Sequence, residues 1–273
     1  DIWTQTYHSM SKLAIVNRKF YIILVLFSVP ICILGQSVHC ERNPLWVEDF
    51  NKGEIPSSDL WVLTEWKAMA KKNGITYNFS QKNANLLIKL ISNNSPKTYF
   101  LANMHTTKKY GMTYGKVEVK AKCPSSKGIW PGIWLRPVRR LNPKVAGEID
   151  LMEWVSCFPK NRFQANFHLW GEFEGKKGNH SQSPKKYDAG GFDINKYHVY
   201  SAEWDSTQLI VKVDGTLVSI WYAKDYSIWP FDYPYELCLD LGYGDWGAAC
   251  GYDTSELPQT MKVDWVKYYR LAE

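Results

Sequence analysis

The stretch Gln208–Trp221, QLIVKVDGTLVSIW, indicates the fold class of this chain most directly. Two runs rich in Val, Ile and Leu flank the pair Asp214-Gly215, and such side chains favour extended strands. Asp-Gly is a preferred pair for the two-residue type I′ turn that joins antiparallel strands. The stretch therefore predicts a β-hairpin.

Strand-like patterns recur on both sides of this hairpin. Residues 115–123, GKVEVKAKC, alternate apolar and charged side chains, which is typical of a strand with one face on a core. Further strand-like runs are found at 45–50, 83–92, 235–244 and 261–270. Helical periodicity is confined to a short segment at 65–72. We expect one antiparallel β-sandwich of jelly-roll type over residues 41–273, with a β-barrel as the alternative.

The composition excludes some partners and favours others. The net charge is +6, and the sequence has no dense run of Lys or Arg, so nucleic-acid binding is not indicated. Aromatic residues make up 15% of the chain. This content suits half-buried sheet surfaces or a ligand with flat apolar faces, such as a sugar ring.

Residues 1–40 resemble a targeting segment. Lys12, Arg18 and Lys19 precede the apolar run Phe20–Gly35, and a basic region followed by a short apolar region is typical of a secretory signal. An uncleaved anchor is the weaker alternative, because a bilayer span needs ~20 residues. We expect an exported protein, secreted or held in the cell envelope.

The cysteine spacing does not indicate which cysteines form disulfides. Six are present, and export would permit disulfides, but their wide spacing leaves the pairing open. Cys40 is a candidate for an N-terminal cysteine that carries a lipid. However, His39, directly before it, is not the small residue that normally precedes such a cysteine. Membrane contact is expected only through the signal or this anchor.

Three carboxylates stand in the apolar stretch Gly147–Trp154, GEIDLMEW. Glu148 and Asp150 share one face of a strand, because side chains alternate. Glu153 joins them only if one extra residue bulges out between Asp150 and Glu153, and bulges are common beside active sites. Neighbouring acids separate into an ionised nucleophile and a protonated donor, which glycoside hydrolysis requires. A solvated polar face and a metal-binding cluster are the alternatives.

The stretch GEIDLMEW matches the E-[ILV]-D-x-x-E signature of glycoside hydrolase family 16 in its bulged, laminarinase-like form. The resemblance extends through 114–137, 167–171, 197–215 and 261–270, and so covers about residues 45–271. It implies a concanavalin-like β-jelly roll and a retaining endo-hydrolase that needs no cofactor. Carried over by position, Glu148 is the nucleophile, Asp150 the assisting acid and Glu153 the general acid/base.

The resemblance also implies residues that line the cleft. Trp130 and Trp134 share parity in GIWPGIW and would serve as sugar platforms, with a core position as the alternative. His168 matches a cleft histidine, and Trp246 stands where the family often has a cleft aromatic. Arg136 has the parity of Trp134 and would meet substrate hydroxyls or lie at a solvated rim.

Two further positions depart from the family pattern, and two others match it. Asn103 stands near a position where many relatives have Arg, and Asp240 replaces an Asn; both places border the cleft in the family. Asp49 and Asp264 match acids that hold a structural calcium ion in the family.

These observations favour an exported, monomeric endo-glucanase that cleaves β-1,3-glucan or mixed-linkage β-1,3-1,4-glucan, with a polysaccharide as its partner. The segment 152–156, MEWVS, resembles the laminarinase version of the motif more than the agarase or carrageenase versions. A galactan hydrolase acting on agar-like or sulfated polymers is the alternative enzyme, supported by the basic segment 136–140. A lectin on the same fold is the alternative outside enzymes.

Overall fold

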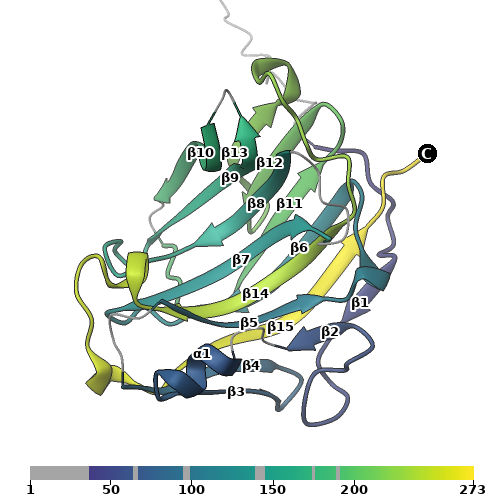
Figure 1. Ribbon diagram of the computed structural model, residues 1–273. Coiled ribbons are helices and arrows are strands. Elements are labelled where there is room, and N and C mark those ends of the chain that lie inside the picture. The colour runs from purple at the N-terminus through teal and green to yellow at the C-terminus, as the bar shows by residue number, and fades with distance from the viewer. Residues whose placement is uncertain (1–36, 64–66, 95–98, 139–144, 174–175, 189–190) are drawn as a thin grey trace, which may run out of the picture. The chain divides into compact units, whose positions relative to one another are not determined.

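The computed structural model describes residues 37–63, 67–94, 99–138, 145–173, 176–188 and 191–273, with the backbone alone over 172–186 (Figure 1). The predicted signal run Phe20–Gly35 lies outside the described residues. In the part of the chain that is described, no helix has the length and apolarity needed to cross a membrane.

The unit Gln36–Glu273 consists of two antiparallel sheets. The first sheet has the order β13 (Thr216–Tyr222), β12 (Gln208–Val213), β11 (His198–Trp204), β6 (Gly115–Lys122), β15 (Gln259–Tyr269), β4 (Leu86–Asn93) and β3 (Ile75–Gln81), with β1 (Trp46–Glu48) paired to β15. The second has the order β10 (Lys176–Asp188), β9 (Arg162–Phe173), β8 (Val145–Glu153), β7 (Ile129–Pro137), β14 (Tyr235–Tyr243), β5 (Phe100–Thr106) and β2 (Trp61–Leu63).

Among the described strands, the first sheet ends at β13 and β3 and the second at β10 and β2, and neither closes on itself. The sandwich prediction is therefore confirmed, and the barrel alternative is wrong. Four 3₁₀ turns and one short helix complete the described elements: α1 (Lys67–Lys72), η1 (Lys108–Tyr110), η2 (Ala223–Asp225), η3 (Asp245–Ala248) and η4 (Thr254–Glu256). The helix α1 falls within the segment where helical periodicity was expected. The first and last strands pair, with Trp46 opposite Tyr268.

The local sequence explains the elements that carry the site. In β6, Val117, Val119 and Ala121 are fully buried while Glu118 and Lys120 between them are half-buried, as the alternating pattern predicted. The predicted hairpin joins β12 and β13, and its central residues Asp214 and Gly215 have φ of 49° and 76°. Positive φ at both positions defines the type I′ turn.

A single apolar core fills the space between the sheets. It joins residues of β8, β9 and β14 from the second sheet to residues of β6, β11 and β15 from the first. Because every second residue of a strand enters this core, the residues between them face away from it. On the second sheet these outward residues form the surface that holds the candidate site.

One disulfide links two loops next to that surface. Cys157 follows β8 and pairs with Cys250, which follows η3; Cys40, Cys123 and Cys238 are free thiols. Cys40 lies in an isolated bridge with Leu271, and its lipidation stays a prediction.

Candidate active site

A β-bulge in β8 collects the three acids on one face. Asp150 lies opposite Asn166 of β9, whereas Glu153 lies opposite Gln164. Two residues of β8, Leu151 and Met152, therefore share the space opposite one residue of β9, and both are fully buried. The predicted bulge is present, and it turns Glu153 to the side of Glu148 and Asp150.

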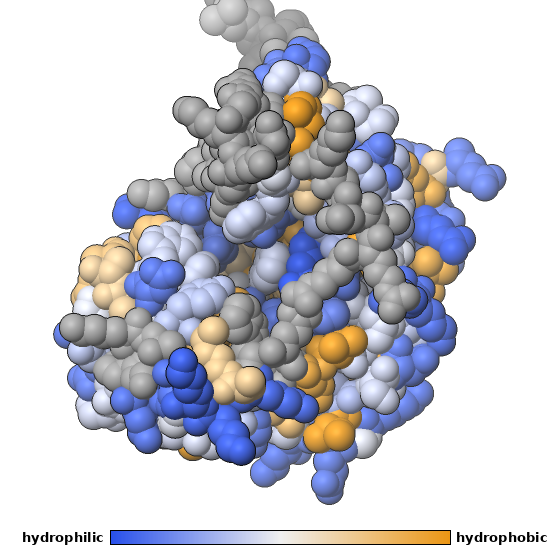
Figure 2. Space-filling view, viewed as in Figure 1, coloured by the Kyte–Doolittle hydropathy of each residue, from blue (hydrophilic) through white to orange (hydrophobic). Residues whose placement is uncertain are grey.

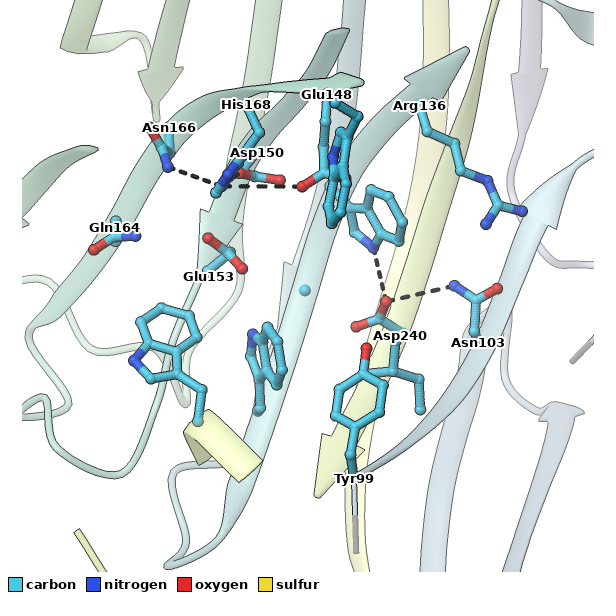
Figure 3. A pocket seen from close by; sticks show the side chains of 16 residues that line it. Tyr99, Asn103, Arg136, Glu148, Asp150, Glu153, Gln164, Asn166, His168 and Asp240 are labelled. Atoms are coloured by element: carbon cyan, nitrogen blue, oxygen red, sulfur yellow. Dashed lines mark hydrogen bonds and ion pairs between the residues drawn. The ribbon is translucent and has the colours of Figure 1, made fainter. Parts of the chain in front are cut away.

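These acids line a cleft of about 520 Å³ on the second sheet. The space-filling view shows this face hollowed near its centre (Figure 2). The cleft is lined by Tyr99, Leu101, Asn103, Trp130, Gly132, Trp134, Arg136, Glu148, Asp150, Glu153, Gln164, Asn166, His168, Trp170, Asp240 and Trp246. The list includes every residue that the sequence placed at the catalytic or substrate-binding site, and Figure 3 shows how they face one another.

Several lining residues were not predicted. Gln164, Asn166 and Trp170 lie on β9 with the parity of His168. The run 162–171 therefore carried a readable signal, because its polar and aromatic side chains alternate with Phe163, Ala165, Phe167 and Leu169, which are buried. Tyr99 precedes β5, and no pattern around it indicated the cleft.

The neighbours of Glu148 affect its pKa in opposite directions. Burial and the nearby Asp150 raise the pKa of Glu148 to about 8, while His168 and the indole of Trp170 lower it. Trp170 donates its Nε1–H to Glu148 Oε2 at 2.8 Å, and a donor to a carboxylate favours the ionised form.

Glu153 lies in a different environment. Burial and the charges of Asp150 and Glu148 raise the pKa of Glu153 well above its usual range. The charge of His168 lowers this pKa, but by less than burial and the two acids raise it. Glu153 is thus held as a neutral acid, whereas Glu148 is the more easily ionised of the two.

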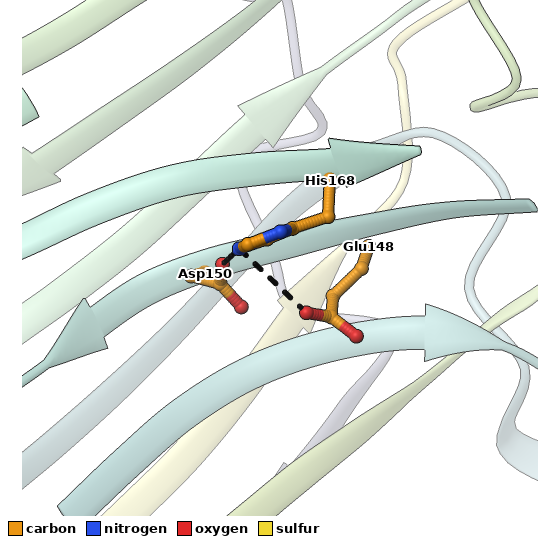
Figure 4. A group of neighbouring side chains, drawn as sticks. All are labelled: Glu148, Asp150 and His168. Atoms are coloured by element: carbon orange, nitrogen blue, oxygen red, sulfur yellow. Dashed lines mark ion pairs between the residues drawn. The ribbon is translucent and has the colours of Figure 1, made fainter. Parts of the chain in front are cut away.

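Asp150 lies between them and contacts a histidine. Its Oδ2 is 3.1 Å from His168 Nε2, and the same nitrogen is 2.9 Å from Asn166 Nδ2. Burial and Asp240 raise the pKa of Asp150 as well. Glu148 Oε1 lies 3.9 Å from His168, so the imidazole stands between two acids (Figure 4).

Among the described residues, one group offers three side-chain metal ligands within 4.8 Å of one another, and it is the same Glu148, Asp150 and His168. The acids proposed for calcium have other contacts: Lys120 lies 2.8 Å from Asp264, and Asn51 donates to Asp49. Lys120 already neutralises Asp264, so these residues fit a calcium ion poorly, and we derive no step from such an ion.

At the other side of the cleft Arg136 is paired rather than free for an anion. Its Nε donates to Glu236 Oε1 at 2.6 Å, and His105 Nδ1 lies 3.2 Å from the other oxygen of Glu236. His105 and Arg136 lower the pKa of Glu236 against the effect of burial. Arg136 therefore lines the cleft as a partner of Glu236.

Comparison with known proteins gives the same family as the motif. The model of glycosyl hydrolases family 16 matches residues 63–267. The chain belongs to this family. Its fold agrees with that of the catalytic domain of an endo-1,3-beta-glucanase (laminarinase) from Thermotoga petrophila RKU-1, with a TM-score of 0.68 at 25% identity over 86% of this chain and 100% of that one.

Two curated relatives of this family 16 chain differ in their substrates. A "Beta-glucanase" of Rhodothermus marinus is 30% identical over 65% of this chain. A "Keratan-sulfate endo-1,4-beta-galactosidase" of Sphingobacterium multivorum is 28% identical over 83% of this chain. The chain spans 64% and 55% of the lengths of these two relatives.

Proposed function

We propose that the protein is an exported endo-acting glycoside hydrolase that cleaves β-1,3-glucan, or mixed-linkage β-1,3-1,4-glucan, by double displacement. One observation carries this proposal: the bulge in β8 sets Glu148, Asp150 and Glu153 side by side in a cleft lined with tryptophans. The relatives named as β-glucanase and laminarinase support the choice of glucan.

The environments of the two glutamates divide the chemistry between them. Glu153 keeps its proton and donates it to the glycosidic oxygen as that bond breaks. Glu148 first loses its own proton, and Trp170 stabilises the resulting carboxylate. This carboxylate attacks the anomeric carbon and forms a covalent glycosyl-enzyme. Glu153, now a carboxylate, accepts a proton from water, and the resulting hydroxide displaces Glu148 from the sugar.

Asp150 and His168 have a supporting role in this scheme. As Glu153 loses its proton, the negative charge beside Asp150 grows, and repulsion would raise the barrier. His168, 3.1 Å from Asp150, lowers the pKa values of Glu148 and Glu153 and so opposes this repulsion. A change at His168 should therefore affect the pH dependence of turnover more than the binding of substrate.

Tryptophans on both sides of the acids provide flat faces for sugar rings. Trp130 and Trp246 meet edge to face with ring centroids 5.2 Å apart, which holds both indoles in place. Trp170 is 41% exposed on the other side of Glu148. The cleft therefore offers stacking surfaces on either side of the cleaved bond, as an endo-acting enzyme requires.

A second candidate is an endo-hydrolase of β-galactosides. It is favoured by the alignment with the keratan-sulfate galactosidase, which covers 83% of this chain against 65% for the β-glucanase. Neither glutamate's role changes in this case, because both substrates require the same displacement at the anomeric carbon.

The test is reducing-sugar release from laminarin, barley mixed-linkage glucan, agarose, carrageenan and keratan sulfate. We expect release from the two glucans, lost in Glu148→Gln and kept in Asp59→Asn, which changes an exposed acid paired with Lys109. Release only from the galactose-containing polymers would replace the glucanase proposal with the second candidate. Binding without hydrolysis of any polymer would instead support a lectin.

A further inference from the structure

A fourth acid, Asp240, lies in the floor of the cleft outside the catalytic group. It belongs to β14, where it pairs with Gly132 of β7 on one side and Asn103 of β5 on the other. Asp240 is only 2% exposed, yet its carboxyl group lines the cleft. A Cβ atom at Gly132 would come within 2.7 Å of Asp240 Oδ1, so this glycine leaves the space that the carboxyl group occupies.

The hydrogen bonds of Asp240 satisfy one oxygen. Trp134 Nε1 donates to Oδ2 at 2.7 Å, and Asn103 Nδ2 donates to the same oxygen at 3.4 Å (Figure 3). Asp240 Oδ1 lies on the side of Gly132. Asn103 is also 2% exposed, and its Oδ1 is buried without a partner. One acceptor in this recess, Asn103 Oδ1, thus lacks a donor.

A buried acceptor without a donor costs free energy, and a hydroxyl group that enters the recess would recover part of it. Sugar hydroxyls are suitable donors, and Tyr99, Trp130 and Trp134 supply apolar faces beside the recess. Figure 3 shows Asp240 and Asn103 on the opposite side of the cleft from Asp150, His168 and Asn166. The sugar that fills the recess is therefore a neighbour of the acids and does not displace them.

The charges around the recess disfavour anionic sugars. Asp240 faces Glu148, Asp150 and Glu153 across the cleft, and each of their pKa values is raised in part by its charge. Arg136 lines the same cleft, and its Nε is held by Glu236 at 2.6 Å. A sulfate or carboxylate group in the recess would meet like charge across a poorly solvated space.

We propose that Asp240 and Asn103 form a specificity recess that binds the hydroxyl groups of an uncharged sugar and rejects sulfated or carboxylated sugars. The inference rests on the proposed glycoside hydrolase function and narrows its substrates to neutral chains. It disfavours the sulfated polymers for which segment 136–140 was considered.

The test compares one backbone with and without charge: laminarin against chemically sulfated laminarin, and desulfated keratan against keratan sulfate. We expect wild-type protein to prefer the neutral form of whichever backbone it cleaves. Asp240→Asn keeps the size of the side chain and an acceptor for Trp134. It should raise kcat/KM for the sulfated form relative to the neutral form by about tenfold at low salt, with a smaller change at high salt.

Asn103→Ala is the matched variant. It removes an acceptor and a donor to Asp240 but no charged group, so KM for the neutral chain should rise about 2- to 10-fold. The ratio between the two forms should stay constant when it is measured about two pH units above the pKa of Asp240, where this acid is ionised in both proteins.

Burial raises the pKa of Asp240 to about 7. The hydrogen bonds from Trp134 and Asn103 and the charge of Arg136 oppose this increase. Asp240 therefore ionises between about pH 6 and pH 8. Over this range the wild-type preference for the neutral form over the sulfated form should increase, and it should increase less in Asp240→Asn.

The same preference can be measured without turnover in Glu148→Gln. Isothermal titration calorimetry compares the affinity of this variant for neutral and sulfated oligosaccharides of one backbone. Equal affinity for neutral and sulfated chains, or an unchanged ratio in Asp240→Asn, would overturn the recess while leaving a hydrolase intact. Selective binding of neutral chains by a wild-type protein that hydrolyses none of them would overturn the proposed function and keep the recess.

Discussion

Replacement of Glu148 by Gln should stabilise the folded protein at neutral pH while it abolishes turnover. The folded state holds the Glu148 proton more tightly than the unfolded state does, because its pKa rises from 4.5 to about 8. This contribution is fully present below about pH 4.5 and is lost as the pH rises through about 8. One pKa unit is about 1.4 kcal/mol, so the loss at pH 7 is at most roughly 3 kcal/mol.

Gln keeps an oxygen for the Trp170 indole and carries no charge beside Asp150. We therefore expect Glu148→Gln to raise the free energy of unfolding by about 2 kcal/mol at pH 7 to 8, or roughly 4–8 °C in Tm for a domain of this size, and by almost nothing at about pH 4. Thermal denaturation at both pH values measures the difference.

The control is Asp59→Asn. Hydrogen bonds with Lys109 and Tyr110 lower the pKa of Asp59, so its contribution to stability changes with pH in the opposite direction to that of Glu148. The stabilisation by Asp59 is present above its ordinary pKa and is lost as the pH falls. A Glu148→Gln variant less stable than wild type at pH 8, or equally stabilised at both pH values, would show that the acids do not repel one another in a buried cluster.

Three further changes test other parts of the site. Trp130→Ala should raise KM about tenfold with little effect on kcat, measured by steady-state kinetics on the cleaved polymer; a fall in kcat alone would contradict stacking. His168→Ala should lower kcat and shift its pH profile, because Asp150 loses its neighbour at 3.1 Å; an unchanged profile would refute this role. Replacing Cys157 and Cys250 by Ser opens a loop of 93 residues and should cost up to about 4 kcal/mol, measured by urea denaturation, where an unchanged midpoint would contradict it.

Local patterns were sufficient for much of the fold. The alternation in residues 115–123 predicted β6, because only one of its faces enters the core. Asp214-Gly215 predicted the β12–β13 hairpin, because few other pairs adopt two successive positive φ values at low cost. The odd spacing between Asp150 and Glu153 predicted the bulge, because a catalytic acid on the core side would be buried without purpose.

Contacts between distant segments could not be read in the same way. The bond from Trp134 to Asp240 joins residues 106 positions apart, and it depends on the pairing of β7 with β14. The Cys157–Cys250 disulfide likewise depends on where two loops meet. Strand alternation gives the face on which a side chain lies, but the order of strands in a sheet decides which faces become neighbours.

The role of Glu148 as nucleophile can be tested most directly by trapping. An activated 2-deoxy-2-fluoro glycoside of the cleaved sugar slows the second displacement and should leave one glycosyl group attached to the protein, found by mass spectrometry on the peptide that contains Glu148 and absent from Glu148→Gln. Proton NMR of the first product of the natural substrate should show the retained anomer. An adduct on another residue, or an inverted anomer formed without any adduct, would contradict double displacement through Glu148.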